Sequence, residues 1–392
     1  MAVRLVRDAS LSAVMAGFVT VLVGFTASGV LIFQAAQALG ATAAQTASWL
    51  WALGIGMAVT SIGLSLRYRT PIGTAWSSAG AALLIASQGV SLGEAIGAFM
   101  LSGLLILLVG FTGLFERLMN RIPLSMASAM LAGILLQFGM NAFTAMTQRF
   151  ELVFPMFAVY VLMRRWKPRY AVIAALVCGS AVAAALGQLH LDTVRLEAAT
   201  PVFMMPEFSW HALLGLGVPL FAVTMASQNL PGVAAIRATG FNPPVSPVVG
   251  WTGATTLALA PFGAFAINLS AITAAIMLGR EAHHELPRRY VAAVSAGVFY
   301  LLIGLFGATV SALFAAFPKE LVLALAVLAL LGTIGNGLAT AVEREAEREP
   351  AIITFLVTAS GVSLLGVGSA FWGIVAGGLA LAAARGFNGS KP

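Results

Sequence analysis

Two long stretches of this chain contain no charged side chain. Residues 9–66 and residues 238–279 have no Lys, Arg, Asp or Glu. Each is long enough for two helical passes through a bilayer core of roughly 30 Å, at ~20 residues per helix. A charge at the bilayer centre costs roughly 2.5–3.5 kcal/mol even on the milder insertion scale, so charges collect in the connections. The chain is therefore predicted to be a polytopic membrane protein.

Composition supports this prediction. Hydrophobic residues make up 60% and charged residues 9% of the chain, outside the range of soluble globular proteins. The 41 glycines suit helices that pack closely in a membrane. Cys178 is the only cysteine, which excludes an intramolecular disulfide and a Cys-rich metal site, and we expect no metal or cofactor. The first apolar stretch is too long for the core of a signal peptide, so it is predicted to be the first transmembrane helix.

The hydrophobic pattern predicts an all-α protein with fourteen membrane segments. They lie near residues 11–33, 47–66, 71–88, 93–115, 122–143, 150–163, 170–189, 210–232, 243–260, 261–279, 290–316, 320–342, 350–366 and 369–385. With the N-terminus in the cytoplasm and alternating segments, 18 of the 21 Lys and Arg residues fall on the cytoplasmic side. Only Arg149, Arg195 and Lys319 fall on the other side. Both termini are therefore predicted to be cytoplasmic by the positive-inside rule, and the charge of +7 indicates orientation rather than nucleic-acid binding.

The longest polar connection, residues 189–209, divides the chain into two sets of seven segments, residues 1–188 and 210–392. An odd number of segments places the two halves in opposite orientation, the arrangement of inverted-repeat transporters. Third in each half is a short segment that begins with proline and is interrupted by Gly and Ser, residues 71–88 and 261–279. Such segments at corresponding positions point to a binding site, although short helices with proline at their first position give the same pattern.

Polar side chains inside the segments form three clusters, and each buried amide or hydroxyl needs a partner because hydrocarbon offers none. Ser28 and Gln34 of the first segment are expected to join them. The alternative is ordinary hydrogen bonding between helices. We expect the Leu230-Pro231-Gly232 run to disturb its helix. The clusters are Thr74, Trp76, Ser77 and Ser78 in the third segment, Ser227, Gln228 and Asn229 in the eighth, and Gly263, Asn268 and Ser270 in the tenth.

The charges that are missing limit the substrate. No carboxylate or histidine lies in the middle of a predicted segment; the nearest are Glu94 and Glu151 at segment ends and His283 and His284 in the connection after the tenth segment. Two half-helix N-termini facing each other would each carry roughly half a positive charge and bind an anion without a fixed cation. This favours a small anion or a neutral molecule over an amine or a metal cation. No nucleotide-binding or metalloprotease motif and no nucleophile–base pair is present, so an enzyme is not predicted.

Four stretches of the chain form a recognisable set: LSAVMAGFVTVLVGFTAS, WLWALGIGMAVTSIGLSLRYRTPIGTAWSSAGAALL, TMASQNLPGVAAIRATGFNPP and APFGAFAINLSAITAAI. Together they resemble the BenE family of benzoate/proton symporters. The resemblance extends over essentially the whole chain. It implies a bacterial inner-membrane carrier that imports benzoate with protons. More distantly it implies the fold of uracil/xanthine permeases and sulfate-type anion carriers, in which a core domain of segments 1–4 and 8–11 moves like an elevator against a gate domain of segments 5–7 and 12–14. A homodimer through the gate domains is also implied.

The resemblance also implies the substrate contacts. The benzoate ring would lie against Phe25, Trp76 or Phe265. The uracil permeases carry glutamates on the eighth and tenth segments, whereas the matching positions here are uncharged, so no buried carboxylate is available for the proton. The implied contacts are Ser77, Ser78, Ala79 and Gly80 in the third segment, Ser227 and Gln228 in the eighth, and Gly263, Ala264 and Phe265 in the tenth, with Phe25, Ser28, Gln34, Trp76, Asn229 and Asn268 as further candidates.

Other functions remain compatible with these residues. Within the same class, the substrate could be another small anion or a nucleobase, and the mechanism could be uniport or exchange. An anion channel would show conductance far above carrier rates. A non-transporting membrane scaffold would show no saturable uptake. Membrane lipid is a partner in every case.

Overall fold

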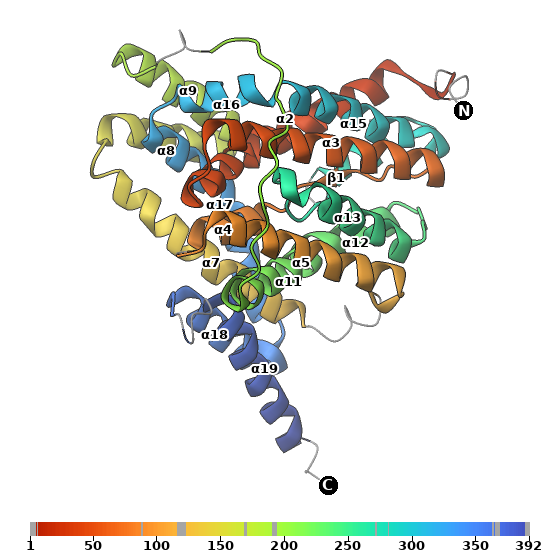
Figure 1. The fold of residues 1–392 in the computed structure, drawn as a ribbon, viewed down its shortest axis with the longest axis vertical. Coiled ribbons are helices and arrows are strands. Elements are labelled where there is room, and N and C mark those ends of the chain that lie inside the picture. Colours follow the sequence, from red (N-terminus) through yellow and green to blue (C-terminus); the bar gives the residue numbers. More distant parts are fainter. Residues whose placement is uncertain are drawn as a thin grey trace.

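Helices make up most of the described chain in this computed structural model (Figure 1). The structure describes residues 5, 7–87, 89–115, 123–167, 171–189, 194–270, 273–280, 282–362, 364 and 369–388. The first half contains α2 (Leu11–Ala38), α3 (Ala43–Tyr68), β1 (Thr74–Ala75), α4 (Ser78–Ala86), α5 (Leu92–Phe111), α7 (Leu124–Ala145), α8 (Phe150–Trp166) and α9 (Ala171–Ala185).

The second half begins with one long helix that changes its winding twice. It comprises α10 (Trp210–Ala212), the π-helical turn η3 (Leu213–Gly217), α11 (Val218–Thr224), the π-helical turn η4 (Met225–Asn229) and α12 (Leu230–Ala238). The remaining elements are α13 (Val245–Leu259), η5 (Ala260–Phe262), β2 (Asn268–Leu269), α14 (Ala274–Leu278), η6 (Leu286–Arg288), α15 (Tyr290–Leu305), α16 (Gly307–Ala315), α17 (Lys319–Glu343), α18 (Glu345–Ala359) and α19 (Ser369–Asn388).

Four described helices are long and apolar enough to cross a membrane. They are Ala43–Tyr68, Leu92–Phe111, Trp210–Arg237 and Leu286–Leu305. The pair Gly307–Ala315 and Lys319–Leu325, which is bent by 109°, would count as a fifth if it forms one broken span. A described helix lies in each of the predicted segments, but fourteen crossings in two inverted halves stay a prediction.

Small residues allow the longest helices to approach closely. A Cβ on Gly54 of α3 would lie 2.5 Å from the Cα of Gly304 on α15. A Cβ on Gly110 of α5 would lie 2.3 Å from the backbone N of Gly250 on α13. Membrane helices depend on such contacts because lipid provides no hydrophobic drive for their association. In the predicted inverted repeat, a two-fold axis between the halves would exchange the α3–α15 pair with the α13–α5 pair.

Charged residues gather at one end of these helices. The carboxylate of Asp8, before α2, lies 3.4 Å from the Arg69 guanidinium after α3 and 3.7 Å from the Arg288 guanidinium before α15. The Tyr290 hydroxyl donates to the same carboxylate at 3.0 Å. All four residues are on the side predicted to be cytoplasmic.

Residues 194–209, here called the crossover segment, run in extended form across the bundle between α9 and α10 (Figure 1). The segment is fixed by hydrogen bonds to helix ends on the side that is predicted to be periplasmic. These bonds join Ala199 N to Leu305 O, Val202 N to Ser48 Oγ, Met204 N to Pro261 O and Glu207 N to Gly93 O. The predicted connection between the two halves therefore also links four helices through hydrogen bonds.

Two predicted segments differ in detail. Residues 290–316 were expected as one segment, but α15 ends at Leu305 and α16 begins at Gly307, with Phe306 between them at φ −100° and ψ 25°. The run Leu230-Pro231-Gly232 does not break its helix, and α12 continues through it. The disturbance lies one turn earlier, in η4. A proline excludes the carbonyl four residues before it, and the wider π-helical turn removes that conflict. Pro219 follows η3 in the same way.

Candidate functional site

The two short segments meet at a pair of strands. β1 and β2 are antiparallel, with Thr74 opposite Leu269 and Ala75 opposite Asn268. Helix α4 starts directly after β1, and the Ser77 hydroxyl caps it by accepting from Gly80 N at 2.9 Å. The Ser77 carbonyl accepts from Ala81 N at 2.8 Å. The N–H groups of Ser78 and Ala79 belong to the first turn, which has no intrahelical partner for them, so they are available to an anion.

Aromatic side chains border this helix start. The Trp76 indole N–H donates to the Ser28 hydroxyl at 3.0 Å, and that hydroxyl donates to the Gly24 carbonyl at 3.1 Å. The Phe25 ring meets the Trp76 ring edge-on, with centroids 5.7 Å apart. The predicted residues Phe25, Ser28 and Trp76 are thus brought together beside Ser77.

Tyr300 of α15 also lies beside Trp76, and it is not among the residues predicted from the sequence. Its ring centroid lies 6.2 Å from that of Trp76. A Cβ on Gly24 would lie 3.2 Å from the Tyr300 hydroxyl and 3.8 Å from Thr273 Cγ2. Among the described residues the hydroxyl has no hydrogen-bond partner, so it can donate to a ligand. A tyrosine in the middle of an otherwise apolar segment was the only signal in the sequence.

The eighth segment supports the strand pair from one side. Asn229 is fully buried, and its Oδ1 accepts from Leu269 N at 2.9 Å while its Nδ2 donates to Met225 Sδ at 3.2 Å. The Ser227 hydroxyl donates to Val223 O of its own helix at 2.7 Å. The half-buried Gln228 makes no side-chain hydrogen bond to any described residue. Asn229 is therefore structural, and Gln228 is the member of this cluster whose amide is available.

The predicted contacts of the tenth segment lie before the strand pair rather than at it. Gly263 has φ 101° and ends η5 against Trp49. Ala264 and Phe265 are fully buried, and the Phe265 ring lies 5.7 Å from the rings of both Trp49 and Phe99. These residues pack the core beside α3 and α5, and the last two lie in the same buried cluster as Trp76 and Ala79.

The opposed half-helices are unequal. Helix α4 has 9 residues and α14 has 5, so α4 is the longer half-helix in the described part of the chain. Asn268 on β2 donates to Ala266 O at 2.8 Å, and its Oδ1 is buried without a partner among the described residues. Thr224 Oγ1 in α11 is likewise buried without a hydrogen-bond partner among the described residues. Buried unpaired polar atoms are rare in native proteins and often mark functional sites.

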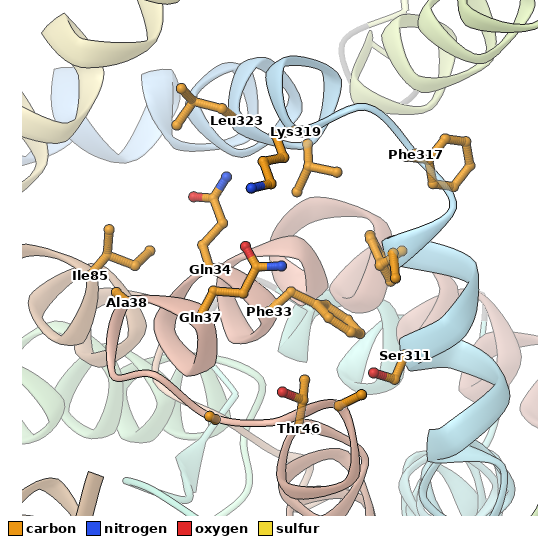
Figure 2. Close-up of a pocket in the computed structure, with 15 residues that line it drawn as sticks. Phe33, Gln34, Gln37, Ala38, Thr46, Ile85, Ser311, Phe317, Lys319 and Leu323 are labelled. Atoms are coloured by element: carbon orange, nitrogen blue, oxygen red, sulfur yellow. The ribbon is translucent and has the colours of Figure 1, made fainter. Parts of the chain in front are cut away.

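Gln34 lies in a different place. It lines a cavity of about 790 Å³ between α2, the start of α3, α16 and the start of α17 (Figure 2). Phe33 lines the same cavity and stacks on Phe314, with centroids 4.3 Å apart. Phe314 in turn lies 6.1 Å from Phe25. The aromatic row connects this cavity with the Trp76 region.

The acidic and basic candidates lie outside the strand-pair site. Glu94 belongs to a capping box with Ser91 at the start of α5, and exposed Glu151 lies 3.9 Å from Arg149. His283 accepts from Glu285 N at 3.0 Å in the connection before α15, and His284 is exposed there. In the described part of the chain, no group of three or more His, Cys, Asp or Glu residues could hold a metal ion. Cys178 is a free, half-buried residue of α9.

Comparisons with known proteins place these features in a family. A family model described as BenE, benzoate membrane transport protein, matches residues 7–383. The chain is 48% identical over 366 residues to "Inner membrane protein YdcO" of Escherichia coli, covering 93% of this chain and 94% of that protein. It is 42% identical over 375 residues to "Benzoate membrane transport protein" of Acinetobacter baylyi, covering 95% of each.

Solved structures share the fold at low sequence identity. SLC26A9 matches with a TM-score of 0.66 and 12% identity, over 98% of this chain and 66% of that chain. The transmembrane domain of the cyanobacterial bicarbonate transporter BicA matches with a TM-score of 0.60 and 13% identity, over 94% of this chain and 97% of that chain. The family and these neighbours are membrane transporters rather than enzymes.

Proposed function

Because the chain belongs to the BenE family of benzoate membrane transport proteins, we propose that this membrane transporter imports benzoate across the bacterial inner membrane. The observation that carries the proposal is the start of α4 at the strand pair, where the first-turn N–H groups lie beside the Trp76 and Phe25 rings. A benzoate ion needs both features, because its carboxylate must be hydrogen-bonded and its ring must be kept from water.

The proposed contacts follow from the free groups at this place. The carboxylate accepts from the N–H groups of Ser78 and Ala79 and from the Tyr300 hydroxyl. The ring lies against Phe25 and Trp76. Gln228 of the eighth segment is proposed as a further donor, because its half-buried amide has no partner among the described residues. Gly80 belongs to this site through its bond to Ser77, whereas Gly263, Ala264 and Phe265 act on it only by packing.

Coupling and movement are further parts of the proposal. We assign proton symport and elevator-type movement of the core domain against the gate domain, with both termini in the cytoplasm. The position of Arg69 and Arg288 together at Asp8 supports the orientation, since the positive-inside rule assigns both arginines to the cytoplasmic side. A homodimer formed through the gate domains is also part of the proposal.

The test is uptake of labelled benzoate into proteoliposomes, with and without an inward proton gradient. Saturable uptake that the gradient stimulates is the expected result. Saturable uptake that ignores the gradient would replace symport by uniport or exchange. No saturable benzoate uptake would overturn the substrate assignment, and screening of other small anions and nucleobases would follow. Conductance far above carrier rates would indicate an anion channel.

The Gln228→Ala variant tests the eighth-segment donor. It is expected to abolish uptake while the amount inserted in the membrane stays the same. Gln188→Ala is the matched control, because Gln188 is a half-buried residue beyond the end of α9 and lies outside the site. Wild-type uptake by the Gln228→Ala variant would remove Gln228 from the site.

A further inference from the structure

The cavity that contains Gln34 is a second place where an anion can bind. Its volume of about 790 Å³ lies within the ~300–1,000 Å³ typical of small-molecule pockets. Side chains from α2 and α17 face each other across it (Figure 2). Its lining residues include Phe33, Gln34, Gln37, Phe314 and Lys319.

The polar side chains that line this cavity include several hydrogen-bond donors and one cation, which suit an anion. Among the described residues that line it, Lys319 is the only charged one, and this exposed side chain forms no ion pair with any of them. Gln34 Oε1, an acceptor, is buried without a partner among the described residues, and the donor group of this amide, Nε2, is directed toward Lys319 (Figure 2). Figure 2 shows the Gln34, Gln37 and Lys319 side chains directed into the same space. The ammonium and the two amides supply several hydrogen-bond donors for one carboxylate.

An aromatic row leads from the cavity to the strand-pair site. Phe33 stacks on Phe314 at the cavity, Phe314 lies 6.1 Å from Phe25, and Phe25 lies 5.7 Å from Trp76. The aromatic rings are therefore in contact from the cavity to the residue before Ser77, with Trp76 at the end of the row. The α2–α3 and α16–α17 connections that border the cavity are both on the side predicted to be periplasmic.

We propose that this cavity is an outer binding site that captures an aromatic carboxylate from the periplasm before it reaches the strand-pair site. The outer site rests on the proposed function for its substrate and its sidedness. Lys319 supplies the attraction, because a lone cation in a partly enclosed space raises the local concentration of an anion and its rate of arrival. Gln34 and Gln37 orient the carboxylate, and Phe33 and Phe314 hold the ring.

The test replaces the cation and then restores it chemically. In a Cys178→Ala background, Lys319→Cys is expected to lower the uptake rate at low external benzoate about tenfold, which corresponds to ~1.4 kcal/mol. Treatment with 2-aminoethyl methanethiosulfonate attaches a side chain that ends in an ammonium and should restore most of the rate. The sulfonatoethyl reagent attaches an anion and should not. Arg195→Cys is the matched control, because Arg195 is exposed on the same predicted side but does not line the cavity.

Each outcome separates the outer site from the proposed function. Wild-type rates in Lys319→Cys, or equal effects of the two reagents, would overturn the outer site while the transporter assignment stands. A protein that takes up no benzoate refutes the proposed function, and the outer site is then tested by binding, because benzoate should slow modification of the introduced thiol severalfold. Absence of this protection would overturn it. Access by the impermeant trimethylammonium reagent only from the cytoplasmic side would refute the periplasmic placement.

Discussion

Gly263 offers the sharpest test of a residue whose predicted role and observed position disagree. The family resemblance makes it a substrate contact, whereas the structure makes it a folding residue at φ 101°. A Cβ there would lie 1.9 Å from Trp49 Cδ1, and Trp49 is fully buried. The left-handed backbone costs an L-residue roughly 1–2 kcal/mol, and overpacking a dense core costs roughly 1–3 kcal/mol more. Gly263→Ala should therefore lose about 2–5 kcal/mol of stability.

The loss is measured on detergent-solubilised protein as the midpoint temperature of unfolding. With ~2–4 °C per kcal/mol, the midpoint should fall by roughly 5 °C or more, together with the amount of protein in the membrane. Gly335→Ala is the matched control, since a Cβ at this exposed position of α17 meets nothing within 4 Å and alanine favours the helix. A Gly263→Ala protein of wild-type stability with a raised KM for uptake would refute this reasoning and restore Gly263 as a substrate contact.

Three further variants test the strand-pair site. Tyr300→Phe should raise the KM for benzoate roughly 10- to 100-fold at unchanged abundance, because a hydrogen bond to a charged group contributes ~1.5–3 kcal/mol; an unchanged KM would show that the hydroxyl does not bind substrate. Ser28→Ala removes the acceptor of the Trp76 indole N–H and should raise the KM about fivefold, for a loss of ~1 kcal/mol, whereas Ser12→Ala at the exposed start of α2 should have no effect. Asn229→Leu leaves the Leu269 N–H unpaired and should destabilise the protein by about 1–3 kcal/mol, seen as a lower unfolding temperature that the exposed Asn242→Leu does not show.

The sequence was sufficient for the class of protein and for the position of the broken segments, because both depend on local composition. Charge-free stretches and a proline before a Gly- and Ser-rich run are visible residue by residue, and β1–α4 takes the predicted form. Tyr300 was missed because its role depends on Gly24 and Trp76, which lie far away in the chain. The packing of Gly263 and Phe265 against Trp49 could not be predicted, because no local signal separates a residue in the core from one at the strand pair; their role as substrate contacts stays a prediction.

Whether a charged group is buried or exposed determines how tightly it binds an anion and how readily the anion leaves. A fixed cation beside α4 would hold a carboxylate strongly in a low-dielectric interior, where Coulomb energies are largest. The strand-pair site has instead neutral donors, namely the first-turn N–H groups of α4 and the Tyr300 hydroxyl. Lys319, the only charged residue among the described residues that line the outer cavity, is exposed, where water weakens its attraction. In the proposed mechanism, attraction is placed where the substrate arrives and moderate binding where the substrate must later leave, as conduction through membrane sites requires.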